Sequence, residues 1–210
     1  MHTVPAEIRN YVEAEILPRY DHFDAGHRRD HVLLVIDSSL RLARVYHLDM
    51  CMAYVVAAYH DTGLVNGRER HHLDSAVLLR ADAVLRQWFT DEQVDIMAEA
   101  VEDHRASAEQ PPRSIYGKVV ADADHDNTAE TIVRRTLQYG LEHYPQMAKE
   151  EQRQRAYAHL QEKYAVGGYL HFWFPETAQS PHLSELRAWM ADGSIDSVFD
   201  RLWTMLATEG

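Results

Sequence analysis

The sequence contains a single cysteine, Cys51, among its 210 residues, which excludes an internal disulfide. Cys51 lies in an apolar stretch, where we expect a small buried side chain without a functional role. The chain also lacks an apolar run of membrane-spanning length, and its N-terminus lacks the basic and then apolar plan of a signal peptide. We therefore expect a cytoplasmic protein without a membrane partner.

Positive charge is scarce relative to negative charge. The chain has 21 Lys and Arg residues against 33 Asp and Glu residues, a formal net charge of −12. Affinity for extended nucleic acid comes largely from neutralising phosphates with Lys and Arg, so the composition argues against such a partner. Any anionic substrate must find a local positive site. Histidine, by contrast, is abundant with 14 copies, which is typical of metal or proton chemistry.

Alternating strand patterns, repeats and flexible linkers are also lacking. Apolar residues recur at helical spacing along nearly the whole chain, which predicts an all-α fold. Thr90-Asp-Glu-Gln93 is a capping-box sequence that predicts a helix start. The expected helices span residues 8–17, 29–46, 50–61, 73–88, 90–104, 114–124, 129–144, 152–164, 183–190 and 195–206.

The pair His60-Asp61 is the most informative feature of the sequence. It ends an otherwise apolar stretch, residues 50–59, which we expect to form a buried helix. Burying an imidazole beside a carboxylate is costly unless something pairs with both, and a divalent cation would do so. Gly63 follows, and glycine just past a helix end predicts a left-handed cap. We therefore expect both side chains on the last turn, where the backbone changes direction.

Two further candidate ligands lie at predicted helix ends. His31 falls in the first turn of one helix, and Asp124 falls at the end of another. Four imidazole and carboxylate ligands leave open positions on a six-coordinate ion, where water and substrate can bind together. Such a ligand set suits Mn²⁺, Fe²⁺, Ni²⁺, Co²⁺ or Mg²⁺, and also Zn²⁺.

The order of these residues resembles the HD superfamily of metal-dependent phosphohydrolases, over about residues 21–138. The matching segments are His31-Val-Leu-Leu-Val35, Ala57-Ala-Tyr-His-Asp-Thr-Gly63, His71-His-Leu-Asp-Ser-Ala76 and Val101-Glu-Asp-His104. The resemblance implies an HD-domain helical bundle over residues 1–145. Residues 146–210 are then a C-terminal helical extension, which we expect to pack on the same core.

The resemblance also implies a metal site with four ligands, namely His31, His60, Asp61 and Asp124. Asp122 competes for the last place, and a helix would turn it roughly 200° from Asp124. Asp124 follows an alanine, as the distal aspartate of the family does. The sequence then departs from the common Ala-Asp-Arg-Leu continuation, because His125 and Asp126 follow.

Three more histidines have open roles. His71 and His104 stand roughly where two-metal HD phosphodiesterases have ligands for a second ion, but they could instead contact a substrate phosphate or face outward. His27 precedes His31 by four residues, so both share a face on a continuous helix. His27 resembles a recurrent family histidine, although a surface or capping role fits it as well.

The resemblance implies hydrolysis of a phosphoester bond in a small phosphorylated metabolite or nucleotide by a metal-activated water. Asp61 could also orient or deprotonate that water. Arg105 and Lys118 are the best placed cations for a phosphate, with Arg68, Arg70 and Arg113 on flanking loops. One alternative is a regulatory HD module that binds a nucleotide and metal without turnover. Another, within the hydrolases, is a phosphodiesterase with a two-metal site.

Residues 164–175 concentrate aromatic side chains after a Gly-Gly break. Such a cluster could wall a nucleotide-base pocket, or it could pack the C-terminal extension onto the helical core. We expect packing, because a large aromatic area most often serves burial. The same surface could form the contact of a homodimer.

Overall fold

The computed structural model describes residues 3–24, 26–108 and 110–209, and the described part of the chain is helical without strands. The predicted all-α fold is therefore confirmed. The chain forms two compact units, of which the first ends at His125 and the second begins at Asp126 and also contains Asp24 and Gly26. Each unit has a cluster of buried apolar side chains. The expected domain boundary at residue 145 and the expected shared core stay predictions.

The first unit begins with a helical segment that changes type twice. The expected end of this segment at Pro18 is wrong, because Pro18 lies in the first turn of η2, where its missing N–H is not needed. The elements of this unit are α1 (Ala6–Tyr11), η1 (Val12–Ile16), η2 (Leu17–His22), α2 (Arg29–Val45), α3 (Met50–Tyr59), η3 (Thr62–Asn66), α4 (His71–Ala81), η4 (Ala83–Gln87), α5 (Asp91–Glu102) and α6 (Ile115–His125).

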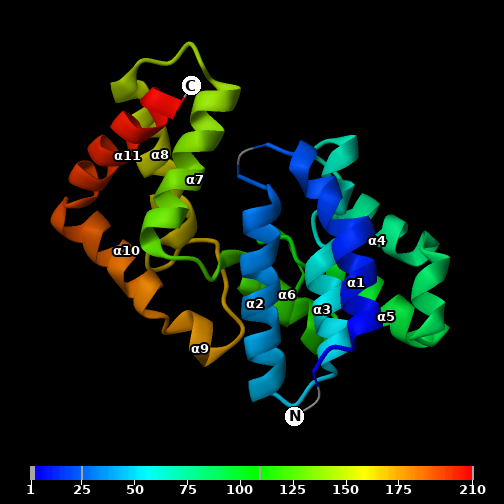
Figure 1. Cartoon of the computed structure of the whole chain (residues 1–210). Helices are drawn as coiled ribbons and strands as arrows, with labels where there is room; N and C mark the ends of the chain where they lie inside the picture. Colours follow the sequence, from blue (N-terminus) through cyan, green and yellow to red (C-terminus); the bar gives the residue numbers. More distant parts are fainter. Residues whose placement is uncertain (1–2, 25, 109, 210) are drawn as a thin grey trace. The chain divides into compact units, whose positions relative to one another are not determined.

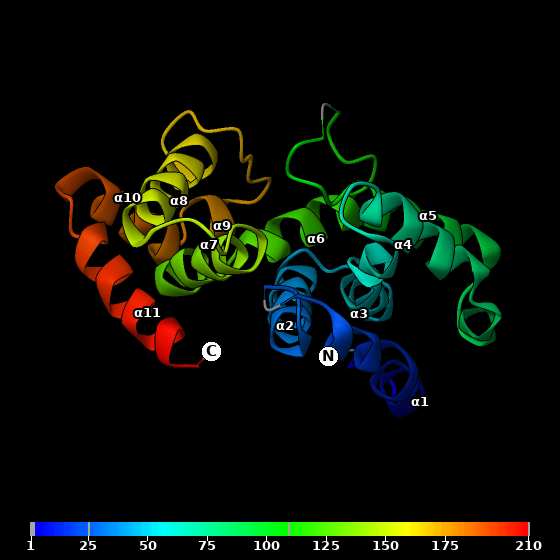
Figure 2. The ribbon, with the colours of Figure 1, turned by 90° about the horizontal axis from the view of Figure 1, so that it is seen from above.

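Helix α3 is the centre of the first unit. It begins at an N-cap formed by Asp49, whose carboxylate accepts hydrogen bonds from the backbone of Cys51 and Met52. Residues 52–59 are all buried, as an all-apolar sequence requires. Helix α3 packs against α2, α5 and α6, and Figure 2 shows it between α2 and α4. The buried end of α3 carries the His-Asp pair into the interior of the unit.

The expected left-handed cap at Gly63 is wrong. The glycines with positive φ among the described residues are Gly67, Gly167 and Gly193, and the chain instead leaves α3 through Asp61, at φ −110° and ψ 5°, into η3. We call residues 59–63 the His-Asp turn. Gly63 is needed there for close approach, because a Cβ on it would lie 2.2 Å from the backbone oxygen of His71 and 2.5 Å from the backbone nitrogen of Ser75. The start of α4 thus lies directly against the His-Asp turn.

The predicted capping box at the start of α5 is confirmed. The side chain of Thr90 accepts from the backbone of Gln93, and the side chain of Gln93 accepts from the backbone of Thr90.

The second unit is a helical bundle in which α7 packs against α8, α10 and α11 (Figure 1). Tyr164 is buried in its core, with Leu170 and Phe172 packed against the same cluster, so part of the aromatic segment packs within this unit, and its expected packing onto the core of the first unit stays a prediction. The elements are α7 (Ala129–His143), α8 (Lys149–Tyr164), α9 (Pro175–Ala178), α10 (Pro181–Asp192) and α11 (Ile195–Glu209). Among the described helices, none has the length and apolar character needed to cross a membrane.

Candidate metal centre

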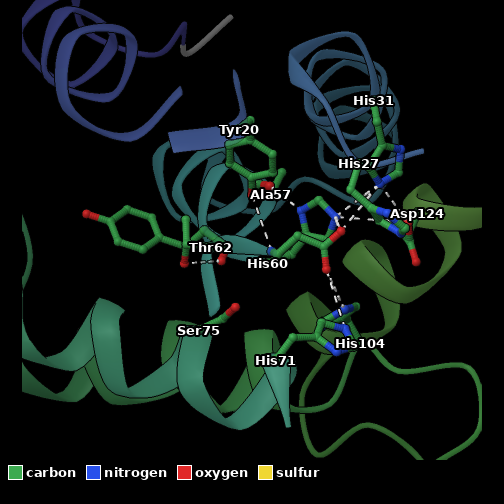
Figure 3. Close-up of polar contacts among 12 residues, drawn as sticks. Tyr20, His27, His31, Ala57, His60, Thr62, His71, Ser75, His104 and Asp124 are labelled. Atoms are coloured by element: carbon green, nitrogen blue, oxygen red, sulfur yellow. Dashed lines mark hydrogen bonds and ion pairs between the residues drawn. The ribbon is translucent and has the colours of Figure 1, made fainter. Parts of the chain in front are cut away.

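Five helices of the first unit bring six imidazole and carboxylate side chains together (Figure 3). The side chains come from the first turn of α2, the His-Asp turn, the start of α4, the residues just after α5 and the last turn of α6. In chain order they are His31, His60, Asp61, His71, His104 and Asp124. We call them the six-residue cluster.

A first group within this cluster consists of His31, His60 and Asp124. The Nε2 atom of His60 lies 3.3 Å from Nε2 of His31. Oδ1 of Asp124 lies 3.1 Å from Nε2 of His31 and 3.9 Å from Nε2 of His60. Three ligand atoms from three helices therefore face one point.

A second group consists of His71, His104 and Asp61. Oδ1 of Asp61 lies 3.4 Å from Nε2 of His71 and 3.6 Å from Nε2 of His104. Its other oxygen, Oδ2, lies 3.2 Å from Nε2 of His60 and 3.7 Å from Nε2 of His31. The carboxylate of Asp61 thus faces the first group with one oxygen and the second group with the other.

Backbone carbonyls fix the tautomers of three cluster histidines. Nδ1 of His60 lies 2.8 Å from the oxygen of Ala57, and Nδ1 of His104 lies 2.6 Å from the oxygen of Val101. Nδ1 of His71 lies 2.7 Å from the oxygen of Arg68. A carbonyl only accepts hydrogen bonds, so each Nδ1 donates, and in the neutral ring Nε2 presents its lone pair to the cluster. Metal-binding histidines are oriented in the same way.

Charge in the cluster favours a cation. Burial lowers the pKa of His60, but the carboxylates of Asp61 and Asp124 outweigh this effect and raise it to about 9. Burial raises the pKa of Asp61, yet the charge of His60 and the hydrogen bond from His104 hold it well below its usual range. Burial lowers the pKa of His71 to about 4, so this imidazole is neutral at pH 7 and can act as a ligand.

These residues fit a divalent metal ion on distance as well as chemistry. Donor atoms bound to one ion at about 2.1 Å lie roughly 3 to 4 Å apart, and the distances given above between Nε2 and carboxylate oxygen atoms within the two groups fall in this range. The side chains of His31, His60, Asp61 and His104 are at most 5% exposed, whereas Asp124 and His71 are 17% and 15% exposed. The cluster is therefore more open beside Asp124 and His71.

Asp122 and Lys118 lie on another face of α6 from Asp124. Asp122 is fully buried, and it is not a member of either group. Helical geometry turns Lys118 roughly 120° from Asp124 but only about 40° from Asp122. Asp124 has a second contact, because Nε2 of His125 lies 3.5 Å from its Oδ2. His125, which departs from the common Ala-Asp-Arg-Leu continuation of the family, therefore lies beside the candidate ligand Asp124.

The expected phosphate-binding cations differ in their surroundings. Arg105 is exposed, and its guanidinium donates to the backbone oxygen of Glu69. Nη1 of Arg68 lies 3.3 Å from Nδ1 of His27, a residue whose ring centre lies 5.8 Å from that of His31. The guanidinium of Arg113 is held by the carboxylates of Asp103 and Glu102, an arrangement that fixes the loop after α5.

Two side chains without a role assigned from the sequence, Tyr20 and Ser75, contact the backbone of the His-Asp turn. The hydroxyl of Tyr20 accepts from the backbone nitrogen of Asp61 at 3.2 Å, and Oγ of Ser75 accepts from that of Gly63 at 2.7 Å. Thr62 completes the turn by donating its hydroxyl to the oxygen of Tyr59. The contacts of Tyr20 and Ser75 join residues 41 and 12 positions apart in the chain, so only the folded structure shows them.

Comparisons with known proteins place the cluster in a family. Residues 28–129 match the model of the HD domain. No curated protein matches the sequence. A solved structure from Lactobacillus plantarum shares 19% identity over 98% of each chain, with a TM-score of 0.56, which shows a common fold. A predicted HD superfamily hydrolase from an uncultured Thermotogales bacterium shares 21% identity over 71% of this chain and 81% of that chain, with a TM-score of 0.48.

The matched residues 28–129 contain every member of the six-residue cluster, each within a helix or at a helix end. The chain therefore contains an HD domain, which the family model matches over residues 28–129.

Proposed function

We propose that this protein is a metal-dependent hydrolase that cleaves a phosphoester bond in a small phosphorylated metabolite or nucleotide. The observation that carries the proposal is the position of the Asp61 carboxylate, which faces two groups of mostly buried ligand side chains. The HD domain is the expected setting for this chemistry, as the resemblance of the sequence implies.

The two groups support a site for two ions rather than one. His31, His60 and Asp124 would hold the first ion, His71 and His104 would hold the second, and Asp61 would contribute one oxygen to each. When bound, such ions would lower the pKa of a water molecule and offset the charge of the phosphoryl oxygens. The protein supplies the fixed ligand orientations and the mostly buried surroundings.

Substrate would approach the more open side of the cluster, beside Asp124 and His71. Arg105 follows His104 directly and has an exposed side chain, so we assign it to the substrate phosphate. Lys118 stays a weaker candidate, because helix geometry directs it away from Asp124. Asp61 is the candidate to orient or deprotonate the attacking water.

The test begins with metal analysis of the full chain, followed by a screen of phosphomonoesters, nucleotides and phosphodiesters with Mn²⁺, Fe²⁺, Ni²⁺, Co²⁺, Mg²⁺ and Zn²⁺. His60→Ala and Asp61→Ala should abolish turnover. His143→Ala, which changes an exposed histidine of the second unit, should leave it unchanged. Unchanged turnover in both cluster variants would refute the assignment. Metal binding without turnover of any substrate would favour the regulatory module.

The number of ions is measured separately. We expect two ions per chain in the wild type and one in His71→Ala. A ratio of one in both proteins, with weaker binding of inorganic phosphate to the variant, would instead make His71 a phosphate contact.

A further inference from the structure

Tyr20 contacts the His-Asp turn with both hydrogen-bonding functions of its hydroxyl. It donates to the backbone oxygen of Ala58 at 2.9 Å and accepts from the backbone nitrogen of Asp61 at 3.2 Å. The side chain is fully buried in η2, 41 residues before Asp61, and its ring packs edge-on against Phe23. A buried phenol must satisfy its hydroxyl, and here the partners are backbone groups beside two candidate ligands.

These hydrogen bonds replace a step of the helical ladder. In an unbroken helix the N–H of Asp61 would donate to the oxygen of Ala57, four residues earlier. Here the N–H of Asp61 donates to Tyr20, and the oxygen of Ala57 accepts from Nδ1 of His60 at 2.8 Å. The N–H of Asp61 is thus held outside the helical ladder by the phenol, while the oxygen of Ala57 accepts from the imidazole.

These hydrogen bonds affect the orientation of both His60 and Asp61. The bond to Ala57 directs Nε2 of His60 toward the first group. The peptide nitrogen held by Tyr20 belongs to Asp61, whose carboxylate oxygens face both groups. A helix continuing through Asp61 would turn the carboxylate with the backbone.

We propose that Tyr20 is a positioning residue of the metal centre, whose hydroxyl ends the helical ladder of α3 and so orients His60 and Asp61 toward the ions. This inference rests on the proposed metal-dependent function. It assigns Tyr20 no contact with substrate or metal.

The test compares Tyr20→Phe with Tyr59→Phe in the full chain. Both changes remove a hydroxyl from a buried tyrosine, but the hydroxyl of Tyr59 donates to Asp82 rather than to the His-Asp turn. Titration with Mn²⁺ measures affinity, and the visible absorption spectrum of added Co²⁺ reports ligand geometry. We expect Tyr20→Phe to bind Mn²⁺ at least about 10-fold more weakly and to change the Co²⁺ spectrum, as loss of an outer contact typically does. Tyr59→Phe should match the wild type in both.

A replacement of Tyr20 by p-aminophenylalanine, which restores a donor and an acceptor, should recover part of the Mn²⁺ affinity. Wild-type affinity and spectrum in Tyr20→Phe would overturn the inference while leaving the proposed function intact. Failure of Tyr20→Phe to fold, when Tyr59→Phe folds, would also overturn it, because the hydroxyl would then support the whole unit. Absence of metal binding in the wild type would refute both proposals.

Discussion

The backbone of Gly63 lies so close to His71 that a Cβ on the glycine would be 2.2 Å from the backbone oxygen of the histidine. This contact joins the His-Asp turn to the first residue of α4. It is the place where the chain brings His71 to the carboxylate of Asp61, with 3.4 Å between Nε2 and Oδ1. The absence of a side chain at residue 63 is thus a condition for forming the second group.

We expect Gly63→Ala to displace the start of α4 and separate the two groups of the cluster. The clashing atoms are backbone atoms of His71 and Ser75, which cannot rotate away as a flexible side chain would. Overpacking of this kind costs about 1 to 3 kcal/mol. Urea unfolding should show the loss, and metal analysis should show one ion instead of two. Wild-type stability and stoichiometry in the variant would contradict the close approach.

A second prediction concerns the shared carboxylate. We expect Asp61→Asn, which keeps the size of the side chain but removes its charge, to weaken metal binding at both groups. Asp124→Asn should weaken the first group alone, and His104→Ala the second alone. Each loss should exceed the 10- to 100-fold typical of outer contacts. Titration of the metal-to-chain ratio distinguishes the cases, and an Asp61→Asn protein that loses a single ion would show that the carboxylate is not shared.

The sequence predicted most of the helices and four of the cluster residues for a physical reason, although the expected helix over residues 73–88 is divided at Asp82 into α4 and η4. His31, His60 and Asp124 are polar side chains at the ends of apolar helical stretches, and such positions can be recognised from spacing alone. The HD resemblance then joined them with Asp61 into one site. The structure brings these four side chains within a few ångströms, while their binding of metal stays a prediction.

The sequence could not decide the roles of His71 and His104, because their placement depends on tertiary contacts. His71 reaches Asp61 through the packing of α4 on Gly63, and the sequence suggested a left-handed cap for this glycine instead. Tyr20 gave no signal at all, since its hydroxyl bonds the backbone and has no partner side chain whose spacing could reveal it. The predicted end of the first helical segment at Pro18 was also wrong, because proline is tolerated in the first turn of a new helix such as η2.

A third prediction concerns Gln152 in the second unit. Its fully buried amide donates to the oxygens of Gly140 and Tyr144 and accepts from Nε of Arg155. At roughly 1 kcal/mol for each of these hydrogen bonds, we expect Gln152→Ala to lower the free energy of unfolding by about 2 to 3 kcal/mol. Gln154→Ala, an exposed change on the same helix, is the control and should cost little. Equal urea midpoints for the two variants would contradict this role.

The last prediction is an acid sensitivity located in α8. Burial lowers the pKa of His159 to about 4, and the positive charges of Lys163 and Arg155 act in the same direction. The unfolded chain binds this proton near pH 6.5, whereas the folded chain binds it only near pH 4, so protons favour unfolding between these values. This destabilising contribution of His159 is close to zero well above pH 6.5 and grows as the pH falls toward 4.

Replacing His159 by glutamine, which does not titrate, should remove this contribution. Urea unfolding followed by tryptophan fluorescence reports mainly on the second unit, because Trp173, Trp189 and Trp203 all lie there. The free energies of unfolding of the wild type and His159→Gln should differ by a constant amount near neutral pH. As the pH falls, the free energy of unfolding of the variant should rise relative to that of the wild type. A difference that stays constant down to about pH 4 would show that the imidazole is not protected from protonation.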